Sequence, residues 1–156
     1  MGKEIERKFL INASAWLAIQ KPVGKLLRQG YILTDPNKTI RVRIADHTGW
    51  LTIKGISVGA SRLEYEYEIP LAEAKELLDN FSEAELEKIR YEITYKGKLW
   101  EVDVFAGYNN GLVVAEIELL SEDEQFEIPE WVAEEVTHDK KYYNSNLTKH
   151  PFKDWA

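Results

Sequence analysis

Residues 2–10 read GKEIERKFL, and charged and apolar side chains alternate along this segment. In an extended strand successive side chains point to opposite faces, so Glu4, Glu6 and Lys8 share one face and Ile5 lies on the other. Neighbours on one face lie roughly 6.5–7 Å apart. At that spacing two carboxylates can share a hard cation, and the lysine can reach an anion bound to it. For this segment alone, a half-buried strand with a solvated charged face is the better explanation, so a binding site requires the same pattern elsewhere in the chain.

The composition is that of a globular protein. A length of 156 residues with 44% hydrophobic residues suits one domain with its own core, and we expect a single domain over residues 1–156. The absence of cysteine excludes disulfides, thiolate metal sites and a cysteine nucleophile. The three histidines are far apart and show no ligand spacing. Any metal would therefore be a hard ion bound through oxygen.

Charge and hydropathy indicate where the protein is located and which classes of partner it can bind. The chain begins with charged residues, and no apolar run approaches the ~20 residues of a membrane span. We therefore expect a cytoplasmic protein without a membrane partner. The net charge of −7 argues against a nucleic-acid surface, which needs a basic face. It permits a small polyanionic ligand, because the local arrangement of charge decides such binding.

Alternation with a period of two, interrupted by turn residues, predicts about eight strands. They are expected at residues 2–10, 25–34, 39–44, 50–54, 62–69, 86–95, 99–105 and 112–120. Most are joined by hairpins, which indicates an antiparallel sheet. Helices are expected at residues 15–18, 71–81 and 129–133, and residues 137–155 are expected to be mostly irregular.

The alternation places charge on one face of seven strands. These charged residues are Glu4, Glu6, Lys8, Arg41, Arg43, Lys54, Glu64, Glu66, Glu68, Lys88, Arg90, Glu101, Asp103, Glu116 and Glu118. An ordinary solvated face mixes such residues with Thr, Ser, Gln and Asn, and like charges on neighbouring strands repel each other. We therefore predict an α+β, mainly β fold, in which the antiparallel sheet closes into a barrel with a charged lumen. The apolar face then points outward, where a few flanking helices and the Trp-rich tail cover part of it.

The charged face has the chemistry of a site for phosphoryl transfer. Its six cations suit a chain of phosphates, which arginine binds through its planar fork and lysine binds as a point charge: Lys8, Arg41, Arg43, Lys54, Lys88 and Arg90. Its carboxylates favour Mg²⁺ or Mn²⁺, and Mg²⁺ usually takes one or two carboxylates together with phosphate oxygens and water. Transfer of a phosphoryl group to water needs little beyond positioning and charge neutralisation.

Several segments resemble one known family. Residues 4–8, EIERK, resemble the E-x-E-x-K signature of the CYTH superfamily, also called the triphosphate tunnel metalloenzymes. The similarity continues in order through RVR (41–43), TIK (52–54), EYEYE (64–68), KIR (88–90), WEVD (100–103) and AEIE (115–118). The tail HDKKYYNSNL (138–147) resembles that of compact bacterial members. No signature position is missing.

This resemblance implies an eight-stranded antiparallel tunnel that hydrolyses a triphosphate with Mg²⁺ or Mn²⁺. It implies a metal site of Glu4, Glu6 and Glu118, with Glu116 close by, and phosphate binding by the six cations named above. Catalysis is then expected to depend on Glu4, Glu6, Lys8, Tyr31, Lys54, Lys88 and Arg90. Glu64, Glu66 and Asp103 are further acidic tunnel residues. Tyr31 either assists the leaving group or packs as an aromatic side chain, and Lys140 either closes one tunnel end or lies on the surface.

The leading functional hypothesis is an inorganic triphosphatase that removes the terminal phosphate of tripolyphosphate and accepts nucleoside triphosphates more weakly. So short a chain shows no evident element for base recognition. An adenylyl cyclase and a thiamine triphosphatase on the same fold remain alternatives. A non-enzymatic polyphosphate- or nucleotide-binding module is disfavoured, because an anion receptor gains little from so many carboxylates. The oligomeric state stays open.

Overall fold

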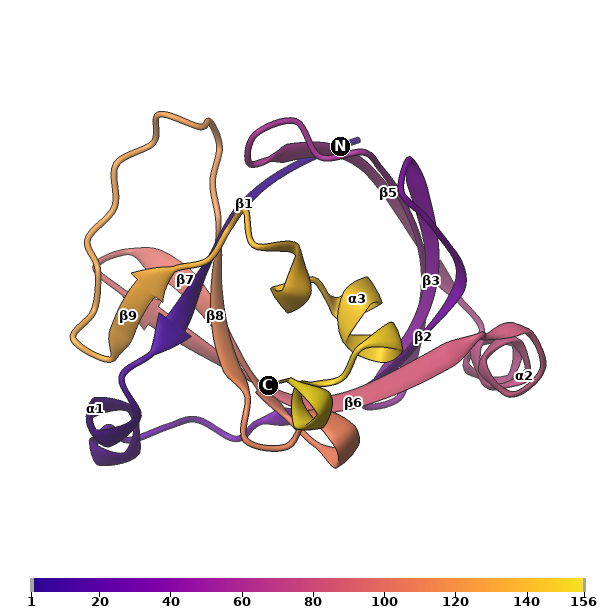
Figure 1. The fold of residues 1–156 in the computed structure, drawn as a ribbon, viewed down its shortest axis with the longest axis horizontal. Helices are drawn as coiled ribbons and strands as arrows, with labels where there is room; N and C mark the ends of the chain where they lie inside the picture. Colours follow the sequence, from indigo (N-terminus) through magenta and orange to yellow (C-terminus); the bar gives the residue numbers. More distant parts are fainter. Residues whose placement is uncertain (1, 156) are drawn as a thin grey trace.

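A closed antiparallel β-barrel forms the centre of the computed structural model, which describes residues 2–155 (Figure 1). The strands are β1 (Lys3–Ile11), β2 (Lys25–Asp35), β3 (Lys38–Ala45), β4 (Thr48–Gly55), β5 (Ser61–Ile69), β6 (Ala84–Tyr95), β7 (Lys98–Phe105), β8 (Val113–Glu118) and β9 (Val132–Glu135). The α-helices are α1 (Ala13–Ala18), α2 (Leu71–Phe81) and α3 (Asn144–Lys149). Short 3₁₀ turns are η1 (Gly107–Asn109), η2 (Lys140–Tyr142) and η3 (Phe152–Asp154).

Eight of the strands form the barrel, as the sequence predicts. Their order is β5-β4-β3-β2-β6-β7-β8-β1, and β1 pairs back with β5 to close the sheet. The closing register is short, since only Lys3–Ile5 and Ser61–Leu63 are paired. Every pairing in the barrel is antiparallel, with a register shift between Tyr31 and Leu33 of β2, and the charged faces of β1 and of β3 to β8 point inward.

The helix expected at residues 129–133 is wrong, because this part of the chain continues into β9. The barrel strand β5 begins at Ser61, so β1 beyond Glu6 has a free edge on that side. The strand β9 pairs with this edge, with Phe9 opposite Glu135. An unpaired edge has backbone groups that need hydrogen-bond partners, and β9 supplies them.

The outer face of the barrel near α1 is covered by aromatic side chains. Trp16 of α1 packs against Trp131, and Trp131 packs against Trp100 with ring centroids 5.8 Å apart. Trp100 is fully buried, whereas Tyr65 and Tyr67 on β5 are exposed. The outward orientation of the apolar face is thus as predicted.

The helix α2 covers a second part of the outer face. It buries Ala74 and Leu78 against Val42 and the strands around it. A Cβ atom on Gly49 would lie 2.6 Å from the Cβ of Ala74, so glycine at this position allows the helix to approach the sheet closely. In the described part of the chain, none of the helices has the length and apolar character needed to span a membrane.

The C-terminal tail is divided between the two faces of the barrel. Trp131 covers part of the outer face, as expected, whereas residues 142–155 pack at one end of the lumen, which corrects the expectation for this part of the tail. Figure 1 shows α3 and the neighbouring yellow segments within the ring of strands. The reason is visible in the lumen, where apolar side chains replace charged ones toward one end of the barrel. Tyr142 and Leu147 of the tail pack there against Leu86, Phe105 and Val114. The tail is also more regular than expected, since it contains η2, α3 and η3.

Candidate functional site

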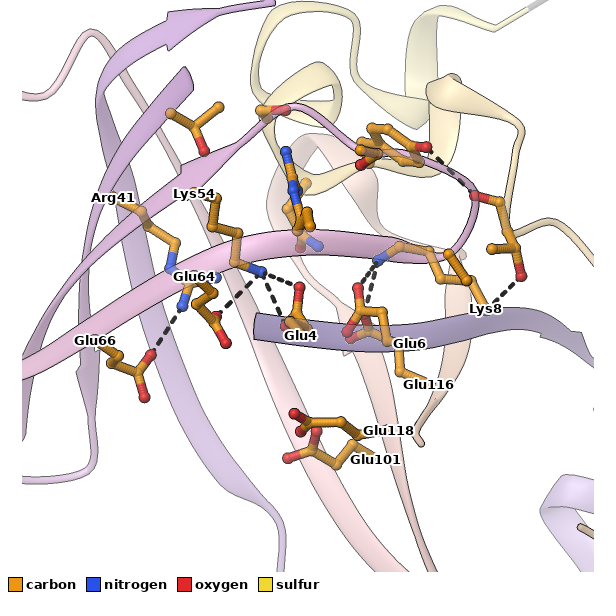
Figure 2. Close-up of a pocket in the computed structure, with 18 of the residues that line it drawn as sticks. Glu4, Glu6, Lys8, Arg41, Lys54, Glu64, Glu66, Glu101, Glu116 and Glu118 are labelled. Carbon is orange, nitrogen blue, oxygen red and sulfur yellow. Dashed lines mark hydrogen bonds and ion pairs between the residues drawn. The ribbon is translucent and has the colours of Figure 1, made fainter. Parts of the chain in front are cut away.

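The charged part of the lumen is a cavity of about 220 Å³. Side chains from all eight barrel strands line it, and Figure 2 shows several of them facing one another. Its charged lining consists of six basic and seven acidic residues, which are Lys8, Arg41, Arg43, Lys54, Arg62, Arg90, Glu4, Glu6, Glu64, Glu66, Glu101, Glu116 and Glu118. Most of the predicted site residues therefore do come together.

Strand register explains why acidic and basic side chains alternate around this cavity. Glu4 lies opposite Arg62, and Lys8 lies opposite Glu116. Opposite charges on facing positions attract each other across antiparallel strands. Two pairs of cavity residues depart from this pattern, because Glu6 lies opposite Glu118 and Glu101 lies opposite Glu116.

Two lysines on the β1 side of the cavity are paired with carboxylates. The Nζ of Lys8 lies 2.7 Å from Oε2 of Glu116 and 3.4 Å from Oε1 of Glu6. The Nζ of Lys54 donates hydrogen bonds to both oxygens of Glu4, at 3.1 and 3.2 Å (Figure 2). These lysines are ammonium groups held in place before any substrate arrives.

The arginines of β3 are less completely paired. Arg41 donates from Nη2 to Thr52 at 3.1 Å and to Glu66 at 3.4 Å. Its buried Nε has no hydrogen-bond acceptor among residues 2–155. Arg43 donates from Nε to Gln29 at 3.1 Å and forms no ion pair with a carboxylate of the described residues. Two guanidinium groups thus retain donors for an anion.

Burial and repulsion act together on Arg43. Desolvation, followed by the charges of Arg41 and Arg90, lowers the pKa of Arg43 to about 9. Because burial and repulsion make the charged form of Arg43 unfavourable in the free protein, an anion that enters the cavity stabilises this charge. The β3 side of the lumen is therefore suited to bind negatively charged oxygen atoms.

Next to the cavity, the carboxylate of Asp103 forms ion pairs with two cations, Arg90 and Lys88. It accepts hydrogen bonds from Nε and Nη2 of Arg90 at 2.7 and 2.9 Å, and its Oδ2 lies 2.7 Å from Nζ of Lys88. Burial lowers the pKa of Lys88 to about 7, although Asp103 opposes this shift. Lys88 is fully buried and is not among the residues that line the cavity, so the structure places it and Asp103 behind the wall formed by Arg90.

Glu6 and Glu118 form the acidic side of the cavity. Burial, followed by the charge of Glu116, raises the pKa of Glu6 to about 7. Burial and the charges of Glu4, Glu64 and other carboxylates raise the pKa of Glu118 to about 7. The Glu118 carboxylate has no hydrogen-bond donor or ion pair among the described residues. Two facing carboxylates with too little positive charge near them are suited to a cation.

Over residues 2–155, no three carboxylate or imidazole groups are arranged as a complete metal site by themselves. Mg²⁺ usually takes one or two carboxylates and completes its coordination with phosphate oxygens and water. The predicted roles of Glu4, Glu6, Glu116 and Glu118 in metal binding stay predictions. Two of them are already engaged, Glu4 by Lys54 and Glu116 by Lys8.

Two residues with alternative predicted roles are now placed. Tyr31 is buried, lines the cavity and accepts a hydrogen bond from Nε2 of Gln29 at 3.3 Å. Tyr31 therefore lies at the site, and both of its predicted roles stay predictions. Lys140 lies exposed in η2 and does not line the cavity, so it is a surface lysine.

Several residues of the cavity and of the inner face around it were absent from the predicted set. Arg62 is the first residue of the strand predicted at 62–69 and has the same parity as Glu64, so the alternation already indicated it. Gln29 and Thr52 are uncharged members of the inner face and carry no such signal. The tail residues Tyr143, Asn144 and Ser145 line the cavity only because the chain returns into the barrel, which strand patterning does not reveal.

Comparisons with known proteins agree with this geometry. The model of the CYTH domain family matches residues 2–151. An inorganic triphosphatase of Acetivibrio thermocellus is 51% identical over 156 residues, which cover 99% of both chains. An inorganic triphosphatase of Nitrosomonas europaea is 40% identical over 153 residues, covering 92% of this chain and 95% of the relative. Among solved structures, an inorganic triphosphatase matches with a TM-score of 0.65 and 35% identity over 95% of each chain.

Proposed function

Because this chain belongs to the CYTH domain family, we propose that it is an inorganic triphosphatase, a hydrolase that cleaves the terminal phosphoanhydride bond of tripolyphosphate. The observation that carries this proposal is the pair of β3 arginines, Arg41 and Arg43, which line a small charged cavity with their guanidinium donors, and Arg43 forms no ion pair with a carboxylate of the described residues. Such donors, set among four further cations, fit a short chain of phosphates. The relatives named inorganic triphosphatase point to the same substrate.

The size of the cavity favours an inorganic substrate over a nucleotide. At about 220 Å³ it is smaller than the ~300 Å³ at which pockets for organic ligands usually begin. Its walls are mainly charged, so a nucleoside would have little apolar surface to pack against. We expect a triphosphate group to be held inside and any larger substituent to remain outside.

We propose Mg²⁺ or Mn²⁺ as the cofactor, held by Glu6 and Glu118 together with substrate oxygens. The support is the chemistry of the donor set, since both carboxylates are hard oxygen donors whose pKa values are raised first by burial and then by neighbouring carboxylates, and a divalent cation offsets both effects. Glu4 and Glu116 lie beside them and hold the lysines in place. When bound, such an ion polarises phosphate oxygens and activates a water molecule.

The chain's own residues supply positioning and charge neutralisation for the reaction. Lys8, Lys54 and Arg90 surround the phosphates as cations and offset the charge that develops on the departing diphosphate. The Tyr31 hydroxyl accepts its hydrogen bond from Gln29, which leaves its proton free to be donated to a leaving oxygen. Lys88 contributes from behind the wall, through Asp103 and the position of Arg90.

Phosphate release tests the function. The purified protein is incubated with tripolyphosphate, ATP or thiamine triphosphate in the presence of Mg²⁺ or Mn²⁺, and cyclic AMP is measured in parallel. We expect tripolyphosphate to be hydrolysed with the highest kcat/KM and no cyclic AMP to form. Cyclic AMP as the main product from ATP would assign the chain to the cyclases instead. Tight binding of tripolyphosphate without metal-dependent turnover would assign it a receptor function.

A further inference from the structure

The tail reaches the cavity at the point where α3 begins. Asn144, the first residue of α3, lines the cavity together with its neighbours Tyr143 and Ser145. The rest of α3 is anchored by Leu147, which is fully buried among the apolar side chains at this end of the lumen. The backbone that carries Asn144 is therefore fixed relative to the barrel.

The side chain of Asn144 is oriented by a buried lysine. Nζ of Lys88 donates a hydrogen bond to Oδ1 of Asn144 at 2.9 Å. The same Nζ lies 2.7 Å from Asp103 and 5.5 Å from the centre of the Phe105 ring, so its position is determined on three sides. Because the lysine donates, the oxygen of the amide must face it.

An amide whose oxygen faces the wall presents its nitrogen on the opposite side. In the described residues, Nδ2 of Asn144 donates to no acceptor, and Asn144 is in the cavity lining, so this NH₂ group is not enclosed by protein. We propose that Asn144 is a substrate-binding residue, whose Nδ2 donates a hydrogen bond to an oxygen of the phosphate nearest to α3. Lys88 is then a positioning residue that acts on the substrate through this amide.

This assignment rests on the proposed triphosphate substrate and deepens it. A neutral donor beside so many cations adds direction to the binding of a phosphate without adding charge. It also explains how the buried Lys88, which does not line the cavity, can affect substrate binding. The competing explanation is that Asn144 merely ties the tail to the barrel through Lys88.

Two substitutions separate these explanations. Asn144→Asp retains the oxygen that Lys88 donates to and the shape of the side chain, but replaces the NH₂ donor by an acceptor. Asn144→Ala removes both groups without adding charge. Binding of tripolyphosphate is measured by isothermal titration calorimetry in the absence of divalent metal, and KM and kcat are measured with Mg²⁺. Thermal unfolding midpoints are recorded for each variant.

A hydrogen bond to a charged phosphate corresponds to about tenfold in affinity. We expect Asn144→Ala to weaken binding and raise KM about tenfold, and Asn144→Asp to weaken binding more, while its unfolding midpoint stays at or above that of the parent protein. The matched control is Asn146→Asp in the same helix, whose Nδ2 donates to the Lys140 carbonyl outside the cavity, and we expect less than a twofold effect on binding.

The proposal is overturned if both Asn144 variants bind tripolyphosphate as the parent protein does, or if Asn146→Asp weakens binding as much as Asn144→Asp. If the parent protein binds tripolyphosphate without hydrolysing it, the triphosphatase function fails while the calorimetric comparison still decides the role of Asn144. If the parent protein does not bind tripolyphosphate, both proposals fall.

Discussion

Glu6 on β1 and Glu118 on β8 occupy directly opposite positions of an antiparallel pair, so two carboxylates face each other across one step of the barrel wall. Facing like charges destabilise a sheet unless a ligand or a proton compensates them. The pKa of each group is raised to about 7. Fold stability and cation binding are therefore linked at this pair.

The first prediction concerns pH and stability without metal. Because folding raises both pKa values from 4.5 to about 7, these two groups bind more protons in the folded protein than in the unfolded chain between these pH values. Their contribution to stability must then fall as pH rises through this window. We expect the thermal unfolding midpoint of the metal-free protein to decrease between pH 5 and pH 7, measured by circular dichroism. Glu118→Gln should flatten this dependence, whereas the exposed Glu68→Gln should leave it unchanged.

The second prediction concerns the metal requirement. Removing the charge of Glu118 should raise the Mg²⁺ or Mn²⁺ concentration for half-maximal tripolyphosphate hydrolysis at least ~10-fold. The measurement is a metal titration of Glu118→Gln at saturating substrate. Glu68→Gln again serves as the control, because it lies on the same face pattern but outside the cavity. A half-maximal concentration equal to that of the parent protein would remove Glu118 from the metal site.

The third prediction is that Arg43 contributes to substrate binding but not to the stability of the ligand-free protein. Since Arg43 has no paired carboxylate among the described residues and is repelled by Arg41 and Arg90, Arg43→Gln should not lower the unfolding midpoint of the ligand-free protein. The same change should raise KM for tripolyphosphate about tenfold, through loss of a charged hydrogen bond. Arg7→Gln, on the outer face and paired with Glu135, should leave KM unchanged. An unaltered KM in Arg43→Gln would contradict its role in phosphate binding.

The fourth prediction concerns the buried charges behind the cavity. Asp103→Ala leaves Lys88 and part of Arg90 without their partner, and breaking a buried pair in this way costs about 3–5 kcal/mol of unfolding free energy. Urea denaturation measures the loss. The exposed Lys25–Glu92 pair provides the control, since Glu92→Ala should cost about 1 kcal/mol or less. Adding Lys88→Met to Asp103→Ala should recover part of the loss, and failure to do so would show that the two charges are not coupled.

The fifth prediction tests the location of the tail. Leu147 is fully buried inside one end of the barrel, so Leu147→Ala should lower the unfolding free energy by about 2–5 kcal/mol. Leu120→Ala, at a position that is 91% exposed, should change it by less than about 0.5 kcal/mol. Similar small effects in both variants would mean that the tail does not contribute to the lumen packing.

Strand patterning predicts the barrel and most of its charged lining, because a period of two reports directly which face a side chain takes. It succeeds for Glu4, Arg41 and Glu118 for this reason. Strand patterning does not identify inner-face residues that are uncharged, such as Gln29, since the sequence does not distinguish a buried amide from one on the surface.

Patterning also cannot reveal contacts that depend on the path of the chain in space. The strand β9 forms because β1 has a free edge beyond Glu6, a property of the closed sheet and not of the local sequence. The tail enters the lumen because the inner face becomes apolar at Leu86 and Phe105, and only the assembled barrel brings these residues together. For the same reason Asn144 is invisible as a site residue until the fold is known.

The closing register between β1 and β5 has a consequence for motion. It joins the barrel through three residue pairs, against eight between β3 and β4, and one of the three is Glu4 with Arg62, both in the cavity wall. Local opening of the protein should therefore begin at this seam, where few backbone hydrogen bonds must break. Each such event opens the wall of the cavity itself. A phosphate chain bound across the seam would hold β1 and β5 together, so ligand binding should slow amide hydrogen exchange more at Lys3–Ile5 than in any other strand.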